Sequence, residues 1–218
     1  MKVALIGASG FVGAKILQEA LDRGHQVTAV VRRPEALPDH PSLSAVKLDV
    51  QDVEALAQAL GGHEAVISAF NPGRQTAGED VYHQHVAGHR AIIDAVKRSG
   101  VGRYLAVGGA ASLKTAEDVE FLDSPDFPKE YEPFKGGIRG TRAQYYMLKE
   151  EPGLDWVFLA PSVFLTPGER SGAYRTGKDH VLYGEDGQSR ISLEDYAVAM
   201  IDELERPAHH RERFTVGY

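Results

Sequence analysis

Three glycines near the start of the chain, Gly7, Gly10 and Gly13, have the spacing that lets a backbone hold phosphate groups. They directly follow an apolar run, residues 3–6, and an amphipathic stretch begins near residue 11, before the third glycine. In a turn from a strand to a helix, the first glycine permits the tight turn, the second lets a pyrophosphate approach, and the third lets the helix pack close to the strand. We therefore predict a dinucleotide site formed by Gly7, Ala8, Ser9, Gly10, Phe11, Val12 and Gly13.

Two arginines, Arg32 and Arg33, end the second apolar run, residues 27–31. At this place an acidic side chain would accept hydrogen bonds from the ribose of NAD, whereas guanidinium groups suit a ribose 2′-phosphate. The pair therefore favours NADP as the cofactor, with NAD as the alternative. A solvated basic turn is the simpler interpretation of the same two residues.

Small residues follow the later apolar runs, at the places where the rest of a dinucleotide would lie. We expect the cofactor to be bound there by Ser68, Ala69 and Phe70, by Gly108, Gly109 and Ala110, and by Pro161 and Ser162.

Tyr131 and Lys135 stand four residues apart, which on one face of an α-helix would let the ammonium lower the pKa of the phenol. Such a phenol can act as a general acid. Pro133 lies between them and two glycines follow Lys135, so an α-helix does not easily run through this segment. Tyr131 stays a candidate that enters the site from a loop. Ser112 is the best remaining hydroxyl, and its alternative role is to cap a turn.

Short apolar runs alternate with amphipathic stretches through the first two thirds of the chain. Continuous apolar strands separated by helices are typical of a parallel sheet covered on both faces. We therefore predict a doubly wound parallel α/β fold, Rossmann-like, in which ligands bind beyond the carboxyl ends of the strands. The predicted strands are residues 3–6, 27–31, 45–48, 65–68, 104–107 and 156–159, and the predicted helices are about 11–23, 51–60, 79–99 and 138–150.

The last third of the chain has a different composition. Residues 161–188 are rich in glycine and charge, Ser192 is a plausible N-cap for a helix that ends near residue 205, and residues 214–216 predict a short strand. We expect a single domain over residues 1–218, with 161–218 as a small α/β appendage on the substrate side. The loop containing Arg170 and Arg175 has the composition of a lid that meets an anionic substrate, or of a solvated surface loop.

Composition excludes several classes of function. The net charge of −7, with scattered Lys and Arg, gives no basic patch for nucleic acid, and no apolar run approaches the roughly 20 residues that span a bilayer. The absence of cysteine excludes disulfides and thiolate catalysis. We expect a cytoplasmic protein that acts on a small molecule, without nucleic-acid or membrane partners; a homodimer stays open.

His85 and His89 stand four residues apart on a predicted helix, a spacing that can present two metal ligands. No carboxylate or cysteine pattern completes a set, so we predict no metal site. One of these histidines could instead face the active-site cleft.

Six segments of the chain carry a family resemblance: residues 7–13, 107–113, 126–131, 168–172, 189–197 and 213–216. Together they resemble the bacterial NAD(P)H-binding proteins described as NADH-flavin reductases, which are atypical short-chain dehydrogenase/reductases with NmrA-like and biliverdin reductase B-like relatives. The resemblance implies a Rossmann fold, a nicotinamide cofactor and an adenine contact at Asp49 and Val50. Val163 stands where the biliverdin reductase B-like proteins have a histidine, which argues against bilirubin-type chemistry.

In short-chain dehydrogenases, the Tyr-x-x-x-Lys dyad lies on the helix that leads into a Gly-Leu-Asp-Trp segment, here residues 153–156. The family's usual spacing places the lysine near Thr141 or Arg142, and no tyrosine precedes either by four residues. We therefore interpret Tyr131 and Lys135 as a coincidental match. Arg142 could take over part of the electrostatic role beside the cofactor.

Without a dyad that donates a proton, carbonyl reduction is disfavoured, whereas an oxidised flavin accepts hydride at a nitrogen and needs mainly stacking and orientation. We therefore expect an NADPH-dependent oxidoreductase that reduces a flavin or a similar planar, quinone-like acceptor. One alternative is a non-catalytic, NmrA-like NADP(H) sensor. Another is an epimerase or carbonyl reductase that uses Tyr131.

Overall fold

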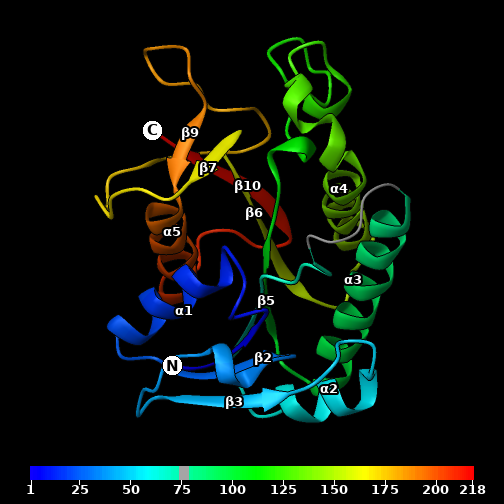
Figure 1. The fold of residues 1–218 in the computed structure, drawn as a ribbon, viewed down its shortest axis with the longest axis vertical. Coiled ribbons are helices and arrows are strands. Elements are labelled where there is room, and N and C mark those ends of the chain that lie inside the picture. Colours follow the sequence, from blue (N-terminus) through cyan, green and yellow to red (C-terminus); the bar gives the residue numbers. More distant parts are fainter. Residues whose placement is uncertain (74–78) are drawn as a thin grey trace.

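The apolar runs of the sequence form the strands of one sheet in the computed structural model, which describes residues 1–73 and 79–218 (Figure 1). Six strands pair in parallel in the order β3-β2-β1-β4-β5-β6. The direction of winding reverses between β1 and β4, the point at which doubly wound sheets bind ligands. These strands are β1 (Lys2–Ile6), β2 (Gln26–Val31), β3 (Leu43–Lys47), β4 (Ala65–Ser68), β5 (Arg103–Val107) and β6 (Asp155–Pro161).

Helices cover both faces of the sheet. On one face α1 (Gly13–Asp22) packs against α5 (Leu193–Glu205), and on the other α3 (Glu79–Ser99) lies between α2 (Val53–Leu60) and α4 (Lys135–Lys149). Each face has its own buried apolar cluster, and the central strands contribute alternate side chains to both. That double burial explains why the strands are apolar without interruption, and the predicted doubly wound fold is confirmed.

The C-terminal residues complete the main sheet. Strand β10 (Glu212–Gly217) pairs in parallel with β6, and β8 (Arg175–Gly177) pairs antiparallel with β10, which gives eight strands. In the described part of the chain, β7 (Phe164–Thr166) and β9 (Arg190–Ser192) form a separate, two-stranded parallel sheet. Helix α5 begins as predicted, because the Ser192 hydroxyl accepts a hydrogen bond of 2.9 Å from the backbone amide of Asp195.

Short 3-10 helices shape the turns around the carboxyl ends of the strands. The helix η1 (Pro34–Ala36) follows β2, and η2 (Ala110–Ser112), η3 (Phe121–Asp123) and η4 (Lys129–Phe134) lie between β5 and α4. In the described part of the chain, no helix is both long enough and apolar enough to cross a bilayer.

Candidate cofactor and substrate site

The glycine loop between β1 and α1 is held by backbone contacts that leave no room for side chains. Gly7 has a left-handed φ of +79°, and a Cβ on it would lie 2.6 Å from the carbonyl oxygen of Ala69. A Cβ on Gly13 would lie 2.1 Å from the carbonyl oxygen of Gly7. The loop therefore brings the first turn of α1 directly against the end of β1, as the glycine spacing predicts.

The N-terminus of α1 is suited to an anion. No side chain caps it and no acidic residue lies in its first turn, whereas α2 and α5 both have a capping side chain and acidic first turns. Its first backbone amides therefore carry partial positive charge that no side chain of the described residues neutralises. These amides and the glycine loop fit the pyrophosphate of a dinucleotide.

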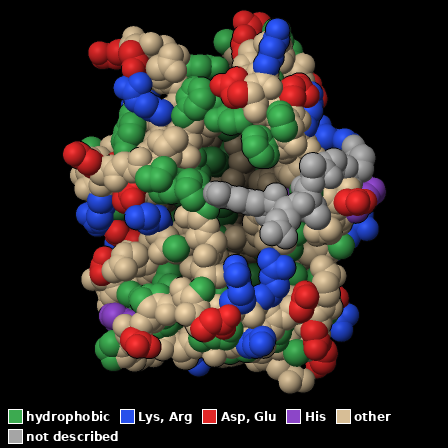
Figure 2. All heavy atoms as spheres, in the orientation of Figure 1, with side chains coloured by type: hydrophobic (Ala, Val, Ile, Leu, Met, Phe, Trp, Pro, Cys, Tyr) green, Lys and Arg blue, Asp and Glu red, His purple; other side chains and the backbone are tan. Residues whose placement is uncertain are grey.

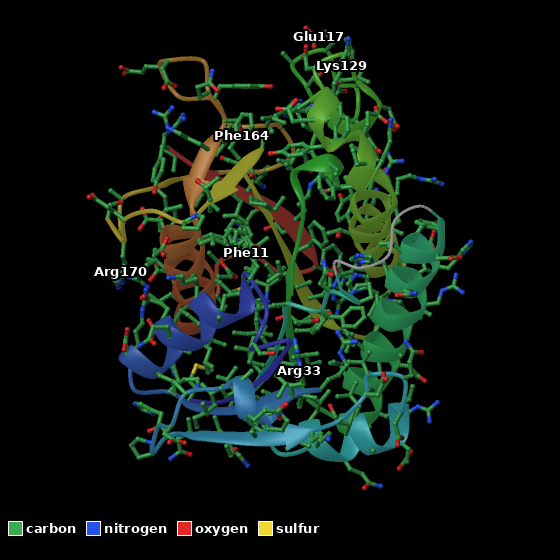
Figure 3. The ribbon with its side chains drawn as sticks, viewed as in Figure 1. Phe11, Arg33, Glu117, Lys129, Phe164 and Arg170 are labelled. Atoms are coloured by element: carbon green, nitrogen blue, oxygen red, sulfur yellow. The ribbon has the colours of Figure 1, made fainter. Side chains whose placement is uncertain are left out.

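The arginines at the end of β2 differ in their contacts. Arg32 donates a hydrogen bond of 3.2 Å to the carbonyl oxygen of Pro72, in the turn after β4. Arg33 is exposed and makes no ion pair or side-chain hydrogen bond with residues 1–73 or 79–218. Figure 3 shows Arg33 at the end of β2, and Figure 2 shows Lys and Arg side chains gathered below the central hollow of this face. Arg33 is therefore available to an anionic group of the cofactor.

The remaining cofactor residues predicted from the sequence lie in the turns after β3, β4 and β5. Asp49 accepts a hydrogen bond of 3.0 Å from the amide of Gln51, and Val50 is buried beside it. Gly109 lies against α4, where its added Cβ would be 3.2 Å from the Thr141 side chain. The structure thus gathers the glycine loop, Arg32, Arg33, Asp49, Ala69, Gly108, Gly109 and Ala110 at one edge of the sheet.

The serine hydroxyls point into the protein instead. Ser112 is 2% exposed and donates to the carbonyl oxygen of Gly109 at 2.9 Å, and Ser162 is 1% exposed and donates to that of Val216 at 2.9 Å. Ser68 is buried as well, at the end of β4, and Pro161 is the buried last residue of β6. The Ser112 hydroxyl therefore caps the η2 turn, and the geometry does not favour the predicted catalytic role.

Tyr131 and Lys135 do not form the arrangement that activates a phenol. Tyr131 lies on the 3-10 helix η4, and α4 begins at Lys135, whose ammonium pairs with Glu132 at 2.9 Å. Burial and the nearby Glu130 raise the pKa of Tyr131 above its ordinary value. A dyad would lower it. Tyr131 nevertheless approaches the segment that follows β6, because its ring centroid lies 6.4 Å from that of Phe164.

The position of Arg142 argues against the predicted role beside the cofactor. Its guanidinium forms ion pairs with Glu120, at 2.7 Å, and with Asp123. Two carboxylates therefore neutralise it on the side of η3. Thr141 of α4, by contrast, lies close to Gly109 in the turn after β5.

His85 and His89 lie inside the interface between α3 and α4. Both are 2% exposed, and His85 Nδ1 lies 3.4 Å from His89 Nε2. Burial lowers the pKa of His85 to about 4 and that of His89 to about 3, so both rings are neutral at physiological pH. The ring of Phe70 packs edge-on against both. The two histidines therefore pack against the ring of Phe70. The sequence alone does not reveal this packing role.

The loop that contains Arg170 is fastened to the body of the protein. Arg170 donates two hydrogen bonds to Glu19 of α1, at 2.7 and 2.8 Å. Ser171 and the amide of Gly172 donate to the buried carboxylate of Asp195. Arg175 donates to the carbonyl oxygens of Tyr183 and Tyr218. Because both arginines are already bound within the protein, these contacts favour the surface loop over the lid.

We expect Glu19→Gln to change how stability depends on pH. Glu19 is 4% exposed, and the hydrogen bond from Arg170 is the main reason why the pKa of Glu19 lies below its ordinary value. A lowered pKa stabilises the folded state at pH values above the ordinary pKa, and this contribution disappears as the pH falls through the lowered one. The variant should therefore lose about 1–3 kcal/mol of unfolding free energy at neutral pH and less at about pH 3.

Urea unfolding at both pH values tests this expectation. Asp22→Asn is the control, because Asp22 lies on the exposed face of the same helix. If acidification lowers the unfolding free energy of the wild type and of Glu19→Gln by the same amount, the expectation is contradicted.

Comparison with known proteins agrees with this geometry. The profile of a family described as NAD(P)H-binding matches residues 7–207. The Bacillus subtilis protein YwnB, described as uncharacterized, is 40% identical over 99% of this chain and 98% of its own length. A solved structure from Bacteroides thetaiotaomicron, described as a candidate epimerase, superposes with a TM-score of 0.91 at 45% identity and covers 100% of this chain and 96% of that one.

Two further solved structures are similar to this chain. One from Streptococcus pneumoniae, described as a candidate NADH-flavin reductase, has a TM-score of 0.85 at 34% identity and covers 100% of this chain and 99% of that one. A short-chain dehydrogenase/reductase from Veillonella parvula, solved in complex with NADP, has a TM-score of 0.74, covers 100% of this chain and 94% of that one, and at 19% identity shares the fold alone.

Proposed function

The chain belongs to the NAD(P)H-binding family of atypical short-chain dehydrogenase/reductases, and from that premise we propose that it is an NADPH-dependent reductase of flavins or similar planar, quinone-like acceptors. That it is an NAD(P)H-dependent oxidoreductase follows from the family. The choice of acceptor and the preference for NADPH are the proposal.

The observation that carries the proposal is the state of the groups that could donate a proton. Lys135 is paired with Glu132, the pKa of Tyr131 is raised, and the Ser112 hydroxyl is bonded to a carbonyl oxygen. A carbonyl acceptor would need one of these groups to protonate the developing alkoxide. A flavin or quinone stabilises the added electron pair within its own ring system and can take its proton from water, so stacking and orientation suffice.

The residues of the chain then have binding and positioning roles. The glycine loop and the N-terminus of α1 would hold the pyrophosphate, and Arg33 would hold the 2′-phosphate. Ala69, Gly108 and Gly109 shape the backbone beside the nicotinamide, from which the bound cofactor supplies hydride. A Cβ on Gly108 would lie 2.3 Å from the ring of Phe158, so this turn stays close to β6.

Anaerobic oxidation of NADPH, followed by its absorbance, tests the proposed function. With FMN, FAD, riboflavin or a benzoquinone as acceptor, we expect one NADPH to be consumed for each two-electron acceptor reduced. NADPH binding without turnover of any of these acceptors would overturn the proposal and would favour the NADP(H) sensor. An epimerase or carbonyl reductase activity that Tyr131→Phe abolishes would favour the reading in which Tyr131 is the acid.

A further inference from the structure

A chain of aromatic rings crosses the carboxyl edge of the sheet above β5 and β6. Phe121 and Phe127 have ring centroids 6.0 Å apart, Phe127 and Tyr131 6.3 Å, and Tyr131 and Phe164 6.4 Å. The first three belong to the segment between β5 and α4, and Phe164 belongs to β7, after β6. Since β5 and β6 are hydrogen-bonded neighbours, the contact between Tyr131 and Phe164 connects the two segments that follow them.

This contact lies on the nicotinamide side of the site. The glycine loop follows β1, and Arg33 follows β2 on the adenosine side. A dinucleotide laid across the switch point therefore extends its nicotinamide half toward β4, β5 and β6. Figure 3 shows Phe164 on β7, on the side that faces the segment after β5. Both rings therefore lie on the side of the sheet where an acceptor would meet the nicotinamide.

We propose that Tyr131 and Phe164 are the two aromatic walls that stack on the acceptor and make the site specific for planar ring systems. This inference rests on the proposed function and names the residues that recognise its substrate. The occupant is a flat, fused ring system, because aromatic faces bind such groups through stacking, and one ring held between the walls leaves the face of the neighbouring ring free to receive hydride from the nicotinamide.

The geometry of the pair allows a ring to enter with a small movement. The two ring planes are tilted by 52° with centroids 6.4 Å apart. A ring held between them needs about 3.5–4.0 Å on each side, so the walls must part by about 1 Å and turn toward parallel. The hydroxyl of Tyr131 makes no hydrogen bond to the described residues, so none opposes this turn. The ring of Phe127 also packs against that of Tyr131.

Substitutions that remove or keep each ring test the proposal. We expect Tyr131→Leu and Phe164→Leu each to raise the KM for riboflavin about tenfold, with NADPH affinity within about twofold of wild type. Tyr131→Phe should keep the wild-type KM because the ring remains. Phe134→Leu is the matched control, since Phe134 lies on the same 3-10 helix but is 65% exposed.

Riboflavin binding to the complex with NADP⁺, measured by quenching of flavin fluorescence, separates the two hypotheses. If the wild-type complex binds riboflavin but does not turn over, the proposed reductase function fails, and the variants still test the walls by their weaker binding. If both leucine variants keep the wild-type melting temperature, riboflavin affinity and KM, the role of Tyr131 and Phe164 in acceptor binding is wrong, and the proposed reductase function still stands. A wild-type complex that does not bind riboflavin would overturn both.

Discussion

Gly13→Ala is expected to lower the affinity for NADPH on the order of 100-fold, or to abolish binding. The new Cβ would lie 2.1 Å from the carbonyl oxygen of Gly7, and that neighbour is backbone that cannot rotate away. The first turn of α1 must then move away from β1, and its amides leave the pyrophosphate. Each hydrogen bond to a charged group contributes about 1.5–3 kcal/mol, so the loss of two accounts for a change of this size.

Titration of NADPH fluorescence measures the affinity, and circular dichroism shows whether the variant is folded. Gly102→Ala is the matched control: a Cβ there meets no atom within 4 Å, and its φ is not left-handed. That variant should bind NADPH as the wild type does. A folded Gly13→Ala protein with wild-type affinity would show that the glycine loop does not hold the cofactor.

The second large effect is expected at Arg33, whose replacement by glutamate should reverse the cofactor preference. The variant loses a bidentate, charge-assisted contact with the 2′-phosphate and adds repulsion, so the kcat/KM ratio of NADPH to NADH should fall about 100-fold or more. The kcat/KM for NADPH should fall, and the kcat/KM for NADH should change little. Because Arg33 has no side-chain partner among the described residues, its removal should leave the melting temperature unchanged.

Lys178→Glu makes the same change of charge at an exposed position outside the turns after β1 to β6 and serves as the control. The preference of the wild type should also weaken at high salt, because the exposed guanidinium is screened. If Arg33→Glu leaves the NADPH to NADH ratio at its wild-type value, the assignment of NADP is wrong.

The architecture can be predicted because strands that are buried on both faces of a sheet are apolar without interruption, and such runs are visible in the sequence. Strands β1, β4 and β5 lie in the middle of the sheet and were predicted to within one or two residues. The edge strand β3 is displaced by one or two residues from the prediction, since none of its side chains is buried and the apolar run is weaker. Strands β7, β8 and β9 were missed because three residues are too few to show a period.

Helix α4 began earlier than predicted for a tertiary reason. Gly136, Gly137 and Gly140 lower helix propensity, so the predicted helix started at residue 138 rather than at Lys135. In the structure a Cβ on Gly140 would lie 2.3 Å from that of His85. Glycine at position 140 leaves room for the side chain of His85 on α3. Packing between the two helices therefore outweighs the low helix propensity of the glycines.

The glycine loop could be found in the sequence because sterics alone demand glycine there. The partners of the polar side chains could not be found in the same way. Arg170 and Glu19 are 151 residues apart, and the partner of the Ser162 hydroxyl is 54 residues away on β10. A local pattern carries no information about such pairs, and that is why the sequence alone leaves open whether Arg170 meets a substrate or lies in a surface loop.

The packing of α1 against α5 also has a consequence for how the chain is made. The apolar side chains of α1, among them Ile16 and Leu21, are complete within the first 22 residues, but the helix that covers them begins at Leu193. During synthesis on the ribosome the side of α1 that packs against α5 stays uncovered until α5 emerges. Contacts between residues so far apart in sequence form slowly, and exposed apolar surface attracts other chains. Until the last helix docks, this apolar side of α1 is therefore open to contacts with other chains.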